Sequence, residues 1–301
     1  MAMFKLGVIS DEISQDFERV LQVMSEYGVR HVEPRSVWDK APQDLDGEDV
    51  ARMKSLLAAY GAECCSIASP FLKCDLGDAE QYKHHLDILA RCLRLAQELG
   101  APLVRTFVFW RTGPARSVWQ QLLDAYEEPV RMAERAGICL GLENEASTHL
   151  ATARETAEFC SALNHPLVRV IWDPANEVFA EEGELPFPDA FERVRPWMVH
   201  MHVKDAVRDS VSGQPRCVPI GDGGYIDYVG QFRALLDMGY EGVCSLETHW
   251  RPSEELDREL LDRPGGQAFS ATGEVASRIC FEKLRALLDT VGWRGPSAAG
   301  G

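Results

Sequence analysis

Four residues with side chains that commonly bind metal ions each lie in or at the end of a short apolar run. They are Glu143 in Leu-Gly-Leu-Glu-Asn, Asp173 in Val-Ile-Trp-Asp-Pro, His202 in Val-His-Met-His-Val and Glu247 in Ser-Leu-Glu-Thr-His. A charged group at the end of a buried strand costs free energy unless it is paired, solvated or bound to an ion. Three carboxylates and one imidazole from four strands therefore indicate one divalent-metal site.

The composition of this site favours a hard cation. An oxygen-rich set of ligands suits Mn²⁺, which we favour, or Mg²⁺ or Co²⁺, while Zn²⁺ fits less well because no thiolate or histidine cluster accompanies it. Each residue alone is explained as well by an acid that caps a strand or a helix. The signal is the set of four, because the intervals from 143 to 173 and from 173 to 202 each correspond to about one β/α unit.

The elements that must position these residues alternate along the whole chain. The predicted strands are 5–10, 31–35, 62–69, 103–109, 139–145, 168–173, 198–205 and 242–249. The predicted helices lie near 15–28, 46–60, 78–99, 117–136, 152–163, 187–194, 227–238 and 272–290. Eight such units predict an α/β protein with a single-domain (β/α)8 barrel over residues 1–294. A doubly wound open sheet is the alternative, but no GxGxxG motif follows the first strand.

Local patterns agree with a barrel. Several predicted helices end at a glycine that can take the left-handed conformation, namely Gly28, Gly61, Gly100, Gly137 and Gly239. In the run 198–205 the apolar and polar residues alternate, so His200, His202 and Lys204 should point into the barrel. The Gly/Pro-rich loop 206–226 is a candidate lid, and 251–273 is a polar stretch. We expect the tail 295–301 to fray.

Composition excludes several classes of protein. The net charge of −16 over 301 residues argues against binding a nucleic acid over a broad surface. The nine cysteines form no CxxC pair, so we expect mostly buried free thiols in a reducing cytosol. A signal-peptide pattern and a membrane-spanning apolar stretch are both lacking, which predicts a cytoplasmic protein without a membrane partner.

Basic residues near the predicted strand ends are candidates for substrate contacts. Three of them, Arg35, Lys73 and Arg105, could bind hydroxyls, a carboxylate or a phosphate, as could Lys204. The competing interpretation is that they pair with nearby acids such as Glu33, Asp75 and Asp205 in structural networks. His249, two residues after Glu247, could touch substrate or support a metal-binding carboxylate.

Longer motifs carry a family resemblance. These are Leu-Glu143-Asn, Trp-Asp173-Pro-Ala-Asn176, His200-Met-His202-Val-Lys204-Asp205 and Leu-Glu247-Thr-His249. The series resembles the sugar phosphate isomerase/epimerase family, a xylose isomerase-like barrel group that includes ketose 3-epimerases and inosose dehydratases. The resemblance implies that Glu143, Asp173, His202 and Glu247 bind the metal and that the substrate is a small sugar or polyol ketone. It is also compatible with a homo-oligomer.

The resemblance also singles out three substrate-side positions. Arg208, six residues beyond His202, matches a position that contacts substrate oxygens in the ketose epimerases. Asn176 stands where those epimerases carry a histidine, and His149 stands where they carry a glutamate. Both departures argue against a plain ketohexose epimerase.

The ligand set suggests a reaction class. A metal chelated by a ketone and the adjacent hydroxyl would make the neighbouring C–H more acidic. Glu143 and Glu247 could then act as catalytic base and acid, giving epimerisation through a cis-enediolate. The same residues would serve an aldose–ketose isomerase, or a lyase such as an inosose or dehydroshikimate-type dehydratase. An endonuclease-type barrel is disfavoured by the charge, and a sugar-binding barrel without catalysis is the non-enzymatic alternative.

Overall fold

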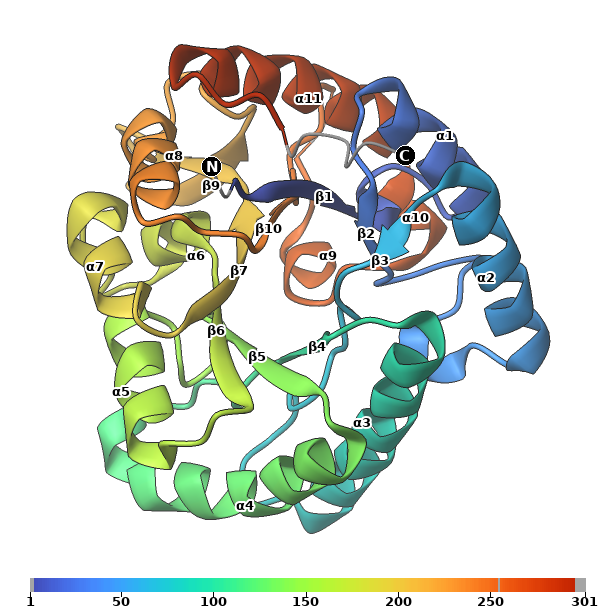
Figure 1. The fold of residues 1–301 in the computed structure, drawn as a ribbon. Helices are drawn as coiled ribbons and strands as arrows, with labels where there is room; N and C mark the ends of the chain where they lie inside the picture. The colour runs from blue at the N-terminus through green and yellow to red at the C-terminus, as the bar shows by residue number, and fades with distance from the viewer. Residues whose placement is uncertain (1–2, 254, 296–301) are drawn as a thin grey trace.

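Parallel pairing of short apolar strands forms the centre of the structure. The computed structural model describes residues 3–253 and 255–295, and within them eight parallel strands join in the order β3-β2-β1-β10-β7-β6-β5-β4 (Figure 1). A parallel bridge between Ile67 and Val104 closes this sheet between its two end strands. The strands are β1 Lys5–Ile9, β2 His31–Glu33, β3 Glu63–Cys64, β4 Leu103–Thr106, β5 Cys139–Glu143, β6 Val168–Trp172, β7 Met198–Val203 and β10 Val243–Leu246.

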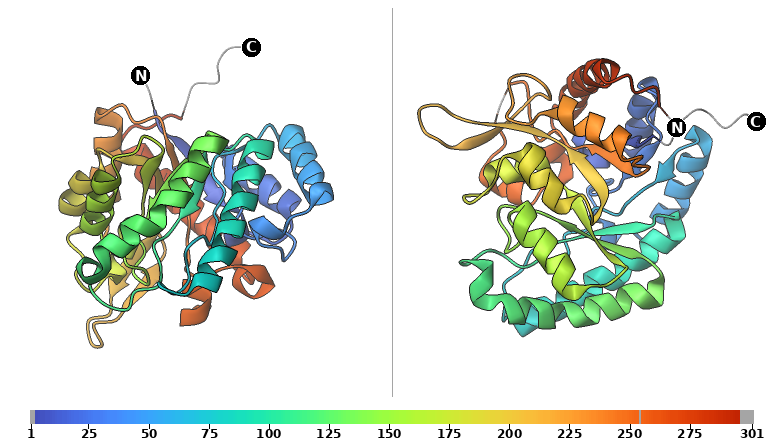
Figure 2. Two further views of the ribbon diagram at one scale, coloured as in Figure 1. Left: turned by 90° about the horizontal axis from the view of Figure 1, so that it is seen from below. Right: turned by 60° about the vertical axis from the view of Figure 1, so that its left-hand side comes forward.

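Helices surround this ring of strands, as Figures 1 and 2 show. The longer ones are α1 Phe17–Glu26, α2 Gly47–Tyr60, α3 Ala79–Leu99, α4 Trp119–Ala136, α5 Ala153–Leu163, α8 Tyr228–Asp237 and α11 Gly273–Thr290. Their sequence signals are those expected, since Gly61, Gly100 and Gly137 take left-handed C-cap conformations. The predicted (β/α)8 barrel is therefore confirmed.

Three predicted segments differ in detail. The helix predicted at 187–194 consists of a one-turn π-helical segment, Pro186–Ala190, followed by the short α7 Phe191–Val194. The helix α6 Pro174–Phe179 precedes it and was not predicted. Several strands are also shorter than predicted, most of all β3, because Ile67 pairs with the chain only through its single bridge.

The two segments predicted to be irregular contain regular structure. The predicted loop 206–226 includes most of an antiparallel hairpin, β8 Asp205–Arg208 and β9 Pro215–Val218. The polar stretch 251–273 includes the short helices α9 Arg258–Asp262 and α10 Gly266–Ser270. The left view of Figure 2 shows the hairpin and these helices at one end of the molecule, away from the two termini.

The apolar core lies between the strand ring and the helices. Met201 and Val203 of β7 pack into it, while the alternate residues His200 and His202 are buried on the other side of the strand among polar groups. All nine cysteines lie in the described part of the chain and are free, and seven of them are buried. Both features agree with the sequence predictions.

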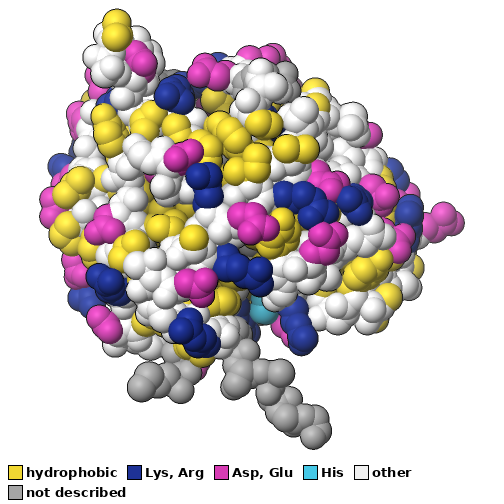
Figure 3. Space-filling view, turned by 90° about the horizontal axis from the view of Figure 1, so that it is seen from above, with side chains coloured by type: hydrophobic (Ala, Val, Ile, Leu, Met, Phe, Trp, Pro, Cys, Tyr) yellow, Lys and Arg dark blue, Asp and Glu magenta, His cyan; other side chains and the backbone are white. Residues whose placement is uncertain are grey.

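The surface carries charges of both signs. On the face in Figure 3 the acidic and basic side chains are interspersed rather than separated into fields of one sign. Among the described residues no helix is long and apolar enough to cross a membrane. Of the predicted tail 295–301, residues 296–301 lie outside the described residues.

Candidate metal centre and active site

The four predicted ligands come together at the carboxyl ends of neighbouring strands. Glu143 ends β5, Asp173 directly follows β6, His202 lies near the end of β7 and Glu247 directly follows β10. One donor atom from each residue lies within 4.8 Å of those from the other three. All four side chains are buried, which is unusual for charged groups. The structure thus brings the four residues singled out in the sequence together in one place.

Basic side chains neutralise this buried acidity. Arg105 Nη1 lies 3.2 Å from Glu143 Oε2, and Arg35 Nη1 donates to Glu247 Oε1 at 2.6 Å. Lys204 Nζ lies 2.6 Å from Asp173 Oδ2 and 3.1 Å from Glu247 Oε2. Buried charges persist only with such compensation.

The pairing partners differ from those suggested by sequence proximity. Arg35 contacts Asp11 and Glu12 as well as Glu247, instead of Glu33. The two lysines likewise pair with acids on different strands or loops: Lys73 with Glu145 rather than Asp75, and Lys204 with Asp173 and Glu247 rather than Asp205. Closure of the barrel therefore places acids from distant strand ends nearer to each basic side chain than the acids that neighbour it in the sequence.

These contacts set the charge states of the cluster. Burial raises the pKa of Glu247, but Lys204 and the histidines outweigh it and hold that pKa well below its usual range. Burial likewise opposes ionisation of Glu143, yet His202 and Arg105 lower its pKa. For Asp173, burial together with the neighbouring glutamates raises the pKa to about 7 despite Lys204. The two glutamates are therefore ionised and able to accept protons.

The donor atoms fit a hard divalent cation. His202 Nδ1 faces Glu143 Oε1 at 3.0 Å and Glu247 Oε2 at 3.4 Å. Asp173 Oδ1 accepts hydrogen bonds from the first backbone N–H groups of α6, and its Oδ2 faces the Lys204 ammonium at 2.6 Å. Three carboxylates and one imidazole whose donor atoms converge within 4.8 Å are a suitable ligand set for such an ion.

Two asparagines hold the strand ends that carry the cluster. Asn144 Nδ2 donates to the carbonyl of Asp173, and the Asp173 N–H donates to Asn144 Oδ1, at 2.8 and 2.9 Å. Asn176 Nδ2 donates to the Asn144 carbonyl and lies 3.4 Å from Glu143 Oε1. Asn144 was not among the predicted site residues, although its place directly after a strand-end glutamate is a visible signal.

Acids that follow β1 also belong to the site and were missed. Asp11 and Glu12 stand immediately after this strand in the segment Ile-Ser-Asp-Glu, and both side chains are buried. Glu12 Oε1 lies 3.3 Å from His249 Nε2, and that nitrogen lies 3.4 Å from Glu247 Oε1. His249 is therefore adjacent to a predicted ligand, as expected for either role proposed for it.

A small cavity adjoins the cluster. It has a volume of about 30 Å³, and its lining includes Asn176, Lys204, His249 and the α9 residues Arg258 and Asp262. In Figure 1, α9 projects across the middle of the strand ring. A larger cavity of about 710 Å³ lies at the opposite, amino-terminal end of the strands, away from the ligand cluster.

The predicted substrate contacts are only partly assembled. Lys73 lies near the small cavity, where its Nζ contacts Glu145 and the Asp262 carbonyl. Arg208 instead lies in the hairpin and donates to the carbonyls of Ala180 and Gly213. His149 is buried, and both its ring nitrogens lack hydrogen-bond partners among the described residues. No contact within the described residues joins Arg208 or His149 to the ligand cluster.

Solved structures share this fold over nearly the whole chain. A xylose isomerase domain protein from Planctomyces limnophilus has a TM-score of 0.71 at 18% identity, covering 97% of this chain and 99% of its own. A D-allulose 3-epimerase from Methylomonas sp. has a TM-score of 0.68 at 17% identity, with 96% and 99% covered. A xylose isomerase-like barrel from Mycobacterium smegmatis in complex with magnesium scores 0.66 at 19% identity, with 95% and 98% covered.

A curated relative is an inosose dehydratase from Klebsiella pneumoniae. It is 29% identical over 150 residues, which are 45% of this chain and 49% of that protein. The match thus spans about half the length of the relative. The named relatives are enzymes, in agreement with the prediction of an enzyme. A family model described as the xylose isomerase-like TIM barrel matches residues 21–264, and the chain belongs to that family.

Proposed function

We propose that this protein is a divalent-metal-dependent isomerase or epimerase that acts on a small sugar or polyol ketone. The observation that carries the proposal is the convergence of Glu143, Asp173, His202 and Glu247 within 4.8 Å. These four residues would hold the ion, for which we favour Mn²⁺ over Mg²⁺, Co²⁺ or Zn²⁺. When bound, the ion would polarise the substrate carbonyl and make the adjacent C–H more acidic. The magnesium complex of the mycobacterial barrel supports the choice of a hard cation.

The two glutamates are suited to move the proton. Each has one oxygen near His202 Nδ1, and its other oxygen faces an arginine: Glu143 Oε2 faces Arg105, and Glu247 Oε1 faces Arg35. Glu143 and Glu247 come from strands on opposite sides of the histidine's strand β7. One would therefore remove the proton next to the substrate carbonyl, and the other would return it. The arginines hold the carboxylates in place and favour their ionised forms, so we assign Arg35 and Arg105 to positioning as well as to binding substrate oxygens.

The remaining assignments concern the rim of the site. Asn176, Lys73 and His249 border the small cavity or its edge and are proposed to contact substrate hydroxyls. Neither Arg208 nor His149 lines the same cavity, so both would need to move to reach it. Arg208 would also have to leave the two backbone carbonyls to which it donates. The partner is a small molecule, in line with the ketose named for the structural neighbour.

A dehydratase is the second candidate. The inosose dehydratase of Klebsiella pneumoniae matches about half of this chain, and Asn176 and His149 depart from the ketose-epimerase pattern. Removal of the proton next to a ketone is the first step of both reactions. The second step separates them, because a dehydratase expels a β-hydroxyl instead of returning the proton.

The test is proton exchange in deuterated water over a panel of ketoses, inososes and their phosphates. We expect metal-loaded protein to incorporate deuterium next to the carbonyl of one substrate class, as followed by NMR, with an epimer or isomer as product. If mass spectrometry instead detected a product that has lost water, the result would favour the dehydratase over the epimerase. Metal content is measured in parallel, and metal binding without exchange or turnover of any compound would favour a sugar-binding barrel.

Variants connect the exchange to named residues. Glu143→Gln and Glu247→Gln should each reduce exchange by about 10²-fold or more, because a lost acid or base typically costs that much. Glu63→Gln is the matched control, since this exposed carboxylate lies at the opposite end of the barrel. Wild-type exchange in either active-site variant would contradict its assigned role.

A further inference from the structure

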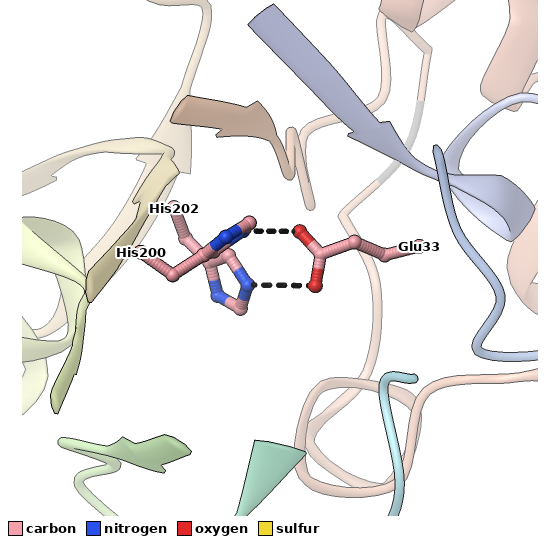
Figure 4. Close-up of side chains that lie close together, drawn as sticks. All are labelled: Glu33, His200 and His202. Atoms are coloured by element: carbon pink, nitrogen blue, oxygen red, sulfur yellow. Dashed lines mark hydrogen bonds and ion pairs between the residues drawn. The ribbon is translucent and has the colours of Figure 1, made fainter. Parts of the chain in front are cut away.

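A third carboxylate, outside the proposed ligand set, lies against the cluster's histidine. Glu33 ends β2, is completely buried and points its carboxylate at the two imidazoles of β7 (Figure 4). Its Oε1 lies 2.6 Å from His200 Nε2, and its Oε2 lies 3.6 Å from His202 Nε2. Both oxygens of Glu33 therefore face imidazole nitrogens deep in the barrel.

The two nitrogens of His202 face different groups. Nδ1 faces Glu143 and Glu247 of the ligand cluster, at 3.0 and 3.4 Å. Nε2 faces Glu33, and neither His202 Nε2 nor Glu33 Oε2 has a closer polar partner among the described residues. An imidazole binds a metal through an unprotonated nitrogen, and the proton of the neutral ring must then be on the other one. The ion held by Glu143, Asp173 and Glu247 can therefore be bound by His202 only through Nδ1, with the ring proton on Nε2.

We propose that Glu33 is a positioning residue that holds the proton on His202 Nε2 and so presents the Nδ1 lone pair to the metal ion. This inference rests on the proposed metal centre. Metal-bound histidines commonly donate their other N–H to a carboxylate, which fixes the tautomer and the orientation of the ring. The carboxylate here comes from β2, a strand that supplies none of the four proposed ligands.

His200 restricts how Glu33 can be replaced. His200 Nε2 lies 2.6 Å from Glu33 Oε1 and 3.2 Å from Ser245 Oγ, which leaves Glu33 Oε2 to face His202. A carboxylate accepts from both Nε2–H groups at once. A glutamine at this position has one oxygen and one NH₂ group, so one histidine would face a donor and would have to change its tautomer.

The first measurement is the affinity for Mg²⁺ and Mn²⁺ by calorimetry at fixed pH. We expect Glu33→Gln to weaken binding by about 10- to 100-fold, which is the usual effect of losing such a partner. Glu33→Asp keeps two acceptor oxygens and should recover part of that loss. His200→Gln is the matched control, because its amide can still donate to Glu33 Oε1 and leaves Oε2 for His202. That control should change the affinity by less than about threefold.

The second measurement reads the proton directly and does not depend on activity. Two-bond ¹H–¹⁵N NMR spectra of ¹⁵N-histidine-labelled, Mg²⁺-loaded protein should show His202 protonated at Nε2 in the wild type and in His200→Gln. In Glu33→Gln at the same Mg²⁺ concentration, a substantial fraction should have lost the ion and should carry the proton on Nδ1, while circular dichroism shows that the fold is kept. A merely structural role for Glu33 would lower stability but leave this tautomer unchanged.

The outcomes separate the two proposals. If the wild type binds divalent ions and folded Glu33→Gln binds them equally with the same His202 tautomer, the assignment of Glu33 is wrong and the metal centre stands. If the wild type binds no divalent ion, the metal centre and the role of Glu33 are both overturned.

Discussion

Lys204 places an ammonium group among the proposed metal ligands. Its Nζ contacts Asp173 Oδ2 at 2.6 Å and Glu247 Oε2 at 3.1 Å, and the side chain is almost fully buried. Those oxygens belong to the same cluster that would bind a divalent cation. The lysine therefore balances part of the cluster's negative charge, and it influences how strongly the fold depends on a metal ion.

Replacing this lysine should make stability depend on metal. Lys204→Met removes the cation that faces the buried Asp173 carboxylate, and breaking a buried pair typically costs about 3–5 kcal/mol. Saturating Mn²⁺ should recover much of the loss, because a ligand that binds only the folded state stabilises it. Thermal unfolding with and without Mn²⁺ measures both effects.

The control is Lys54→Met, which breaks the exposed pair with Glu98. Exposed pairs contribute about 1 kcal/mol or less, so this variant should unfold nearly as the wild type does. If Lys204→Met were no more sensitive to Mn²⁺ than this control, the four residues would not form the proposed centre.

The sequence pointed to the four acidic and imidazole side chains that lie together in the structure, but it could not predict which basic residues pair with them. Glu143, Asp173 and Glu247 were visible because charge at the end of an apolar strand is exceptional. Their basic partners were not visible, since Arg35 lies more than two hundred residues from Glu247 in the chain. Which strand ends meet is decided by closure of the barrel, and no local pattern records it.

At the scale of elements, the hairpin β8–β9 begins with a carboxylate that anchors the following segment. Asp205 Oδ1 accepts from the Ala206 N–H, and Oδ2 accepts from the Gly221 N–H at 2.9 Å. A side chain at Gly224 would clash with this carboxylate, because an added Cβ would overlap both of its oxygens. Asp205 thus joins the hairpin to the segment that leads into α8.

This anchor predicts a pH dependence of stability. Burial raises the pKa of Asp205 to about 6, although backbone hydrogen bonds oppose the change. The folded state therefore holds a proton that the unfolded state releases, and stability from this group is lost as pH rises from about 4 to 6. Relative to Asp205→Asn, the free energy of unfolding of the wild type should fall over this range by at most about 3 kcal/mol.

Urea unfolding of both proteins across this range provides the measurement. The asparagine in the variant Asp205→Asn has one acceptor fewer than the aspartate at every pH. This lowers the free energy of unfolding by a constant amount, which can be distinguished from the pH-dependent change in the wild type. A difference between the two proteins that stayed constant or rose with pH would contradict the assigned burial of Asp205.

Short elements in polar segments were the least predictable. The helices α9 and α10 have five residues each, too few for a helical period to show. The hairpin strands have four residues each and no run of apolar residues. Arg208 illustrates the consequence, because family resemblance gave it a substrate contact while the hairpin directs its guanidinium to backbone carbonyls.

At the scale of the whole molecule, the barrel is weakest where its ends meet. β3 pairs with β2 at two positions, and Ile67 alone forms the bridge to β4 through hydrogen bonds with Leu103 and Arg105. The β5–β6 ladder on the other side has four paired positions. The closed ring thus contains one narrow join between regular ladders.

This join should open first. We expect the amides of Ile67 and Arg105 to exchange with solvent about tenfold faster or more than those of the β5–β6 ladder, a difference of about 1.4 kcal/mol in opening free energy. Native-state hydrogen exchange followed by NMR or mass spectrometry checks it. Equal protection on both sides of the ring would show that the barrel opens as a single unit.

The small volume beside the ligand cluster bears on stereochemistry. At about 30 Å³ the cavity holds a few water molecules at most, far below the roughly 300 Å³ of an ordinary ligand pocket. A substrate would enter only when α9 moves away from Lys73, and closure behind it would exclude bulk solvent. During reaction, stray water would then have no route to deliver a proton to either face of the substrate. The handedness of the product would be decided by the protein's own carboxylates.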